Sequence, residues 1–159
     1  LADIIGPMDS AMNCRIALFP GSFNPFTIGH KSIVDRALRL FDRVIIAVGY
    51  NCAKESDCRS LDERMEAIRR AYCGNEAVEV ASYSCLTADF VRQTGACVIV
   101  RGVRNTVDFE YERSIADINR RLCGVDTVLL YTLPEMESIS SSIVRELERF
   151  GHDVSSFLP

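Results

Sequence analysis

Short apolar runs divide the chain at intervals that suit a parallel sheet. Four of them read RIALF, RVIIAV, CVIV and TVLLY, and a weaker fifth run begins at Ala77. Near-continuous apolar runs of strand length are typical of strands that helices cover on both faces. We therefore predict strands at residues 15–19, 43–48, 77–81, 97–100 and 127–131.

The segments between these runs carry apolar residues at helical spacing. One of them places five apolar side chains three or four residues apart: Val107, Tyr111, Ile115, Ile118 and Leu122. Ser60 and Glu63 form a capping box that opens another helix, and Gly151 suits the C-terminal cap of the last one. The pattern predicts helices over residues 30–41, 60–72, 87–94, 107–122 and 140–150.

This alternation predicts one α/β domain, a single Rossmann-like, doubly wound unit with a five-stranded parallel sheet and helices on both faces. Ligands of such sheets bind beyond the carboxyl ends of the strands, near the point where strand order reverses. Residues 12–159 form the domain. Residues 1–11 are interpreted as a disordered tail or a remnant of expression, because the first convincing strand begins after them.

Composition narrows the class of protein. The chain has 159 residues, which fits one domain, and its net charge is −4. An acidic chain of pI about 5.2 is unsuited to broad binding of nucleic acid or anionic membranes. No apolar stretch approaches the ~20 residues needed to span a bilayer.

Seven cysteines raise the question of disulfides or a metal site. Their number is odd, no CxxC occurs, and several, such as Cys97 in ACVIV, lie inside apolar runs. We interpret them as buried or incidental thiols. Free thiols of this kind indicate that the protein resides in the reducing cytoplasm.

The loop after the first strand holds the most unusual sequence, FPGSFNPFTIGH at residues 19–30. Glycine allows close approach of the backbone to a ligand, and proline stiffens the loop. His30 then falls at a helix N-terminus, where unpaired amides and the helix dipole favour anions. A neutral imidazole there could stabilise a phosphate as charge builds in a transition state. A His that merely caps the helix is the alternative.

Basic and hydroxyl groups follow three other strands at the same predicted edge. Lys54 follows the second strand, Arg101 and Arg104 the fourth, and a serine run, Ser138 to Ser142, the fifth. Taken singly, each could be a solvated side chain or a helix cap. Together they predict a polyphosphate site, although GxGxxG and GxxxxGK[ST] are both absent. No nucleophile–base pair stands out, so we expect direct nucleotidyl transfer by positioning and charge stabilisation.

These motifs resemble a known family. TIGH at 27–30 is similar to the (H/T)xGH signature of the nucleotidylyltransferase superfamily, and the serine run is similar to its ISSS/ISST motif. The ordered set of PGSFNPFTIGH, VRGVR at 100–104, DFEYE at 108–112 and ISSSIVRE at 139–146 resembles the bacterial phosphopantetheine adenylyltransferases over nearly the whole chain.

The resemblance implies transfer of the adenylyl group of ATP to 4′-phosphopantetheine, which gives dephospho-coenzyme A and pyrophosphate. It implies three catalytic residues, His30, Lys54 and Arg101. Acceptor-binding residues would be Ser22, Lys54, Thr87 and Arg101. ATP-binding residues would be Ser22, Phe23, His30, Gly102, Val103, Arg104, Glu112, Met136, Glu137, Ser138, Ile139, Ser140, Ser141 and Ser142.

The resemblance further implies Mg²⁺ bound mainly through phosphates, with no protein metal cage, and a homohexamer; it leaves open feedback by coenzyme A. The family often has Thr and Asp where this chain has Ser22 and Asn24. Two alternatives remain. Nicotinamide or nicotinate mononucleotide adenylyltransferases share both motifs, but usually carry His where this chain has Thr27. A nucleotide sensor that has lost catalysis would keep the same pocket.

Overall fold

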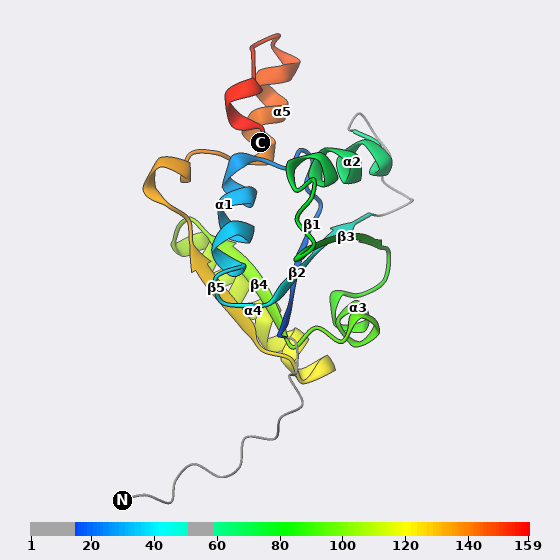
Figure 1. Cartoon of the computed structure of the whole chain (residues 1–159). Coiled ribbons are helices and arrows are strands. Elements are labelled where there is room, and N and C mark those ends of the chain that lie inside the picture. Colours follow the sequence, from blue (N-terminus) through cyan, green and yellow to red (C-terminus); the bar gives the residue numbers. More distant parts are fainter. Residues whose placement is uncertain (1–14, 51–58) are drawn as a thin grey trace, which may run out of the picture.

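The computed structural model describes residues 15–50 and 59–159 (Figure 1). The predicted tail, residues 1–11, lies outside the described residues, and so does Lys54, the predicted catalytic and acceptor-binding lysine. No described helix is long and apolar enough to cross a bilayer.

Five parallel strands form one sheet in the order β3-β2-β1-β4-β5. Strand order reverses between β1 and β4, so the loops after these two strands diverge and leave space between them. The predicted parallel sheet is confirmed. The strands are β1 (Ile16–Gly21), β2 (Arg43–Gly49), β3 (Val78–Tyr83), β4 (Val98–Val103) and β5 (Thr127–Tyr131).

Helices cover both faces of the sheet, as predicted (Figure 1). On one face α1 (Ile28–Ala37) and α2 (Leu61–Ala71) pack on side chains that alternate strand residues direct toward them. On the other face lie α3 (Thr87–Thr94) and the C-terminal end of α4 (Thr106–Cys123). The alternation of β1 illustrates this division: Phe19 belongs to the first core and Leu18 to the second.

The last α-helix, α5 (Ser141–Arg149), projects from the end of the domain at which β1 ends and its following loop begins (Figure 1). Ser140 caps it, because the Ile143 amide donates to Ser140 Oγ over 3.2 Å. Gly151 follows it at φ 77°, a left-handed conformation that favours glycine. Short 3₁₀ helices at Pro134–Met136 and Ser155–Phe157 flank α5.

Two element boundaries differ from the sequence prediction by three residues or more. β4 continues three residues beyond the predicted end because Arg101 and Gly102 pair with Leu129 and Leu130 of β5. Arg101 therefore projects from a strand and not from a loop. α1 ends at Ala37, so the predicted helix over 30–41 was too long at its C-terminus.

The apolar stripe of α4 does not face the core. Val107 is 78% exposed and Tyr111 is 63% exposed, while the buried residues of this helix are Glu112 and Asn119. Helical periodicity identified the helix. It could not distinguish an apolar face that packs on the sheet from one that is exposed to solvent.

Several of the cysteines expected to be buried or incidental thiols are not buried. Among the described cysteines none forms a disulfide, and three are exposed: Cys73, Cys85 and Cys97. Cys97 precedes β4, and its thiol is 3.3 Å from the Ile16 carbonyl oxygen.

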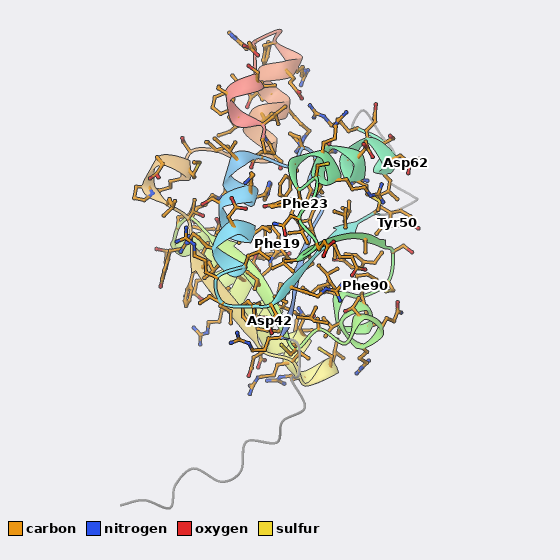
Figure 2. All side chains as sticks on the ribbon, in the orientation of Figure 1. Phe19, Phe23, Asp42, Tyr50, Asp62 and Phe90 are labelled. Atoms are coloured by element: carbon orange, nitrogen blue, oxygen red, sulfur yellow. The ribbon has the colours of Figure 1, made fainter. Side chains whose placement is uncertain are left out.

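The loop after β1 has an unusual conformation. Phe23 is 3% exposed and has φ 47°, in the left-handed region that costs a non-glycine residue about 1–3 kcal/mol. Its ring packs against Phe19, with ring centroids 5.2 Å apart (Figure 2). A Cβ on Gly21 would lie 2.8 Å from two ring carbons of Phe23, so glycine is required at that position.

We predict that Gly21→Ala lowers the free energy of unfolding by about 1–3 kcal/mol, because the new methyl group must displace the Phe23 ring. Urea denaturation measures this cost. In a Phe23→Leu background, which removes the ring, the same substitution should cost less. An equal cost in both backgrounds would show that the Phe23 ring does not impose glycine at position 21.

Candidate active site

A cavity of about 370 Å³ lies between the loops after β1 and β4, at the point where strand order reverses. Phe19 and Phe23, labelled in Figure 2, form part of its inner wall. The cavity unites twelve predicted site residues from four separate segments: Ser22, Phe23, His30, Arg101, Gly102, Arg104, Glu112, Met136, Ile139, Ser140, Ser141 and Ser142.

His30 is held by the N-terminal cap of α1. The Thr27 backbone amide donates to His30 Nδ1 over 3.0 Å, and Thr27 Oγ1 lies 3.0 Å from the same nitrogen. The side chain of Thr27 accepts from the His30 amide in return, so the pair forms a capping box in which His replaces the usual Glu or Gln. Because Nδ1 accepts a hydrogen bond from an amide, the neutral ring carries its proton on Nε2.

Aromatic rings surround this imidazole. Phe26 stacks on His30 with centroids 5.6 Å apart, and Phe23 meets it edge-on at 5.2 Å. Burial, followed by the positive charges of Arg101 and Arg104, lowers the pKa of His30 to about 4. The imidazole is therefore neutral near pH 7 and can donate from Nε2 without carrying charge.

Arg101 is fixed by a carboxylate on α4. Its Nε and Nη2 donate to the two carboxylate oxygens of Glu112 over 2.8 and 2.6 Å, in a bidentate pair. Nη1 also donates to the Pro20 carbonyl oxygen. Glu112 is only 6% exposed. These contacts use three of the five N–H groups of the guanidinium, so two remain for a ligand.

Arg104 has a similar but more exposed partner. Its Nε donates to Asp108 over 2.8 Å, and the Asp108 carboxylate also accepts from the Arg104 amide. Burial alone would raise the pKa of Asp108. The hydrogen bonds and charge of Arg104, with Arg101, outweigh that effect and hold the pKa of Asp108 below its usual range.

Two of the three helices whose first turns line the cavity have no acidic residue there, and the third, α4, carries Asp108. The two without one are α1 and α5, whereas α2, α3 and α4 each carry at least one. Acidic side chains there would neutralise the positive end of the helix dipole. Their absence leaves the unpaired amides of α1 and α5 available to an anion.

The start of α5, which carries the serine run, is hydrogen-bonded directly to the loop after β1. Ser141 Oγ donates to the Pro25 carbonyl oxygen over 2.8 Å, and Arg145 donates to the Asn24 carbonyl oxygen. Arg145 Nη2 also donates to Ser142 Oγ over 3.2 Å. These bonds fix the serine run against the loop after β1.

Some predicted residues do not line this cavity. Val103 is buried beside it and 2% exposed, whereas Glu137 and Ser138 are exposed beyond its rim. Thr87 opens α3 on the other face of the sheet, with Oγ1 3.1 Å from the Tyr83 hydroxyl. The roles of these residues stay predictions.

Sequence reasoning missed Asp108 and Tyr111, which line the cavity from α4. Positions 108, 111 and 112 fall on one helix face, so the spacing from Glu112 could have indicated both. Thr132 also lines the cavity, and no motif marks it.

The described carboxylates offer no metal cage. No group of three His, Cys, Asp or Glu side chains within the described ranges could hold an ion. Asp108 and Glu112, which line the cavity, each bind an arginine. Both carboxylates are therefore already engaged, and the expected Mg²⁺ stays a prediction.

Comparison with known proteins gives consistent matches. A family model described as cytidylyltransferase-like matches residues 18–147. The phosphopantetheine adenylyltransferase of Porphyromonas gingivalis is 57% identical over 148 residues, which cover 93% of this chain and 96% of that protein. That of Bacteroides thetaiotaomicron is 51% identical over 145 residues, 91% of this chain and 95% of that protein.

A solved structure supports the fold. The bifunctional NMN adenylyltransferase/ADP ribose pyrophosphatase of Francisella tularensis superposes with a TM-score of 0.70 at 18% sequence identity. The match covers 90% of this chain but only 44% of that protein. At this identity the likeness concerns the fold alone.

We predict that His30 makes stability depend on pH. A pKa near 4 in the folded chain, against about 6.5 unfolded, means that the unfolded chain binds the proton first as pH falls. The resulting stability is present above pH 6.5 and is lost progressively toward pH 4. Between pH 7 and 5 the wild type should lose about 1–2 kcal/mol more than His30→Gln, measured by urea unfolding. Equal losses in the two proteins would contradict the depressed pKa.

Proposed function

Because the chain belongs to the phosphopantetheine adenylyltransferases of the cytidylyltransferase-like family, we propose that it transfers the adenylyl group of ATP to 4′-phosphopantetheine. The products are dephospho-coenzyme A and pyrophosphate. The chain is thus a nucleotidyltransferase of coenzyme A biosynthesis. The observation that carries the proposal is the neutral His30 at an acid-free helix N-terminus, beside two arginines at the switch point of the sheet.

The reaction is a direct displacement. A phosphate oxygen of the acceptor attacks the α-phosphorus of ATP, and the bond to the pyrophosphate oxygen breaks. The acceptor supplies the nucleophile, so no covalent enzyme intermediate is needed. The protein has to align the two phosphates and stabilise the charge that develops on the α-phosphate oxygens.

His30 stabilises that charge by donating from Nε2. Since Thr27 occupies Nδ1, the donor is oriented before the substrate arrives and needs no reorganisation during the reaction. Arg101 binds the acceptor phosphate with the N–H groups that Glu112 leaves free, and Lys54 assists it. Arg104, Gly102 and the serines at the start of α5 hold the nucleotide.

When bound, Mg²⁺ would neutralise charge on the ATP phosphates. The carboxylates of Asp108 and Glu112 remain with their arginines, and the amides of α1 and α5 bind phosphate oxygens. The protein residues thus select the triphosphate by position.

Self-association into a homohexamer is part of the proposal, as is a cytoplasmic location. Self-association is supported by the exposed apolar side chains of α4, which are Val107, Tyr111, Ile118 and Leu122. Side chains of this kind along one helix are typical of surfaces that bind another protein.

The function is tested by pyrophosphate release with Mg-ATP, with 4′-phosphopantetheine and nicotinamide mononucleotide offered in parallel. We expect release with 4′-phosphopantetheine only. Release with the mononucleotide only would keep the fold and overturn the acceptor. ATP binding without pyrophosphate release in the presence of either acceptor would identify a sensor.

We predict that His30→Ala lowers kcat by at least about 10²-fold and changes ATP affinity little, because the lost donor acts mainly in the transition state. Steady-state kinetics and equilibrium ATP binding measure the two effects. His152→Ala is the matched control, since His152 is the other histidine of the chain and is exposed. A His30→Ala variant with kcat within about threefold of wild type would remove His30 from the catalytic step.

A further inference from the structure

Arg64 of α2 reaches across to the loop after β1. Its Nη1 donates to the Ser22 carbonyl oxygen over 2.7 Å and lies 3.4 Å from the Gly49 carbonyl oxygen. Ser22 lies 42 residues before Arg64, and Gly49 lies 15 before it. The arginine therefore joins two segments that meet only in the folded chain.

Ser22 and Gly49 directly follow the last residues that pair between β1 and β2. The β1–β2 ladder ends with Gly21 beside Val48, so the next position on each strand is Ser22 and Gly49. The β1–β2 pairing ends here, and the Ser22 and Gly49 carbonyl oxygens both accept from Arg64. A guanidinium is suited to join them, because it presents several donors in one plane.

The base of the Arg64 side chain is itself well fixed. Ser60 and Glu63 form a reciprocal capping box, with bonds of 3.2 and 2.7 Å. The Arg64 amide donates to the Ser60 carbonyl oxygen over 3.1 Å, and its Nε lies 3.4 Å from the same oxygen. The capped first turn of α2 thus holds the guanidinium at the strand ends.

We infer that Arg64 is a positioning residue for catalysis, which orients Ser22 by fixing its carbonyl group to the end of β2. The inference rests on the proposed function and on the sequence expectation that Ser22 binds both ATP and the acceptor. Ser22 is exposed and lines the cavity, so its own packing does not orient it. Arg64 acts through the peptide group of Ser22, and the side chain that meets the substrates is that of Ser22.

The test compares wild type with Arg64→Ala, Arg64→Lys and Arg69→Ala. Arg69 lies on the same helix, and its side chain is 52% exposed, with Glu66 at 4.0 Å, so its removal controls for charge on α2. The measurements are kcat and KM for both substrates, equilibrium Mg-ATP binding, and thermal unfolding. We expect Arg64→Ala to lower kcat/KM for the acceptor at least about tenfold and to weaken Mg-ATP binding, since small displacements of positioned groups are costly.

Arg64→Lys should recover only part of the loss, because one ammonium group keeps the charge but not the planar set of donors. Guanidinium ion should partly restore Arg64→Ala, and sodium chloride at equal ionic strength should not. Arg69→Ala should match wild type. If Arg64→Ala does not fold, Arg64→Lys decides alone.

Wild-type kinetics for Arg64→Lys, or a variant that loses thermal stability while its kcat, KM and ATP affinity are unchanged, would overturn the inference and leave Arg64 structural. A wild-type enzyme that releases no pyrophosphate would instead refute the proposed function. In that case Mg-ATP affinity across the same variants still tests the role of Arg64, and unchanged affinity would overturn it.

Discussion

The hydrogen bond from the Thr27 amide to His30 Nδ1 is the constraint on which the site depends. It begins α1, it selects the tautomer of His30, and it turns the other ring nitrogen into a donor. The stacked Phe26 ring and the buried Thr27 side chain keep the imidazole in that orientation. A protonated ring could not accept this bond, so the same contact that forms the helix cap also opposes charge on the ring. One local motif therefore joins folding and chemistry.

The charges around His30 are balanced before any substrate binds. Arg101 and Arg104 each hold a carboxylate, so the paired side chains bring little net positive charge to the cavity. The attraction for phosphate then comes from the free guanidinium N–H groups and from the acid-free N-termini of α1 and α5. Glu112 also keeps Arg101 rigid. A site of this kind favours a ligand whose several phosphates match its donors in position.

The sequence predicted the parallel sheet, the limits of α3 and β5, and His30 at a helix N-terminus, because each follows from local periodicity or capping. It could not predict contacts between distant segments. Nothing in VRGVR or DFEYE alone indicates that Glu112 binds Arg101 in a fork, or that Arg64 reaches Ser22. The exposed face of α4 was missed for a related reason: periodicity describes a helix but not what covers it. His30 Nδ1 as an acceptor became evident only from the backbone geometry of Thr27.

The most direct test of the account is ¹⁵N NMR of the His30 imidazole, assigned by comparison with His30→Gln and followed from pH 7 to pH 4. We expect an unprotonated Nδ1 and a protonated Nε2 at pH 7. We also expect a pKa of about 4 for His30, well below the usual 6.5. A proton on Nδ1, or titration at or above 6.5, would contradict the claim that the cap of α1 prepares a neutral Nε2 donor for the transferring phosphate.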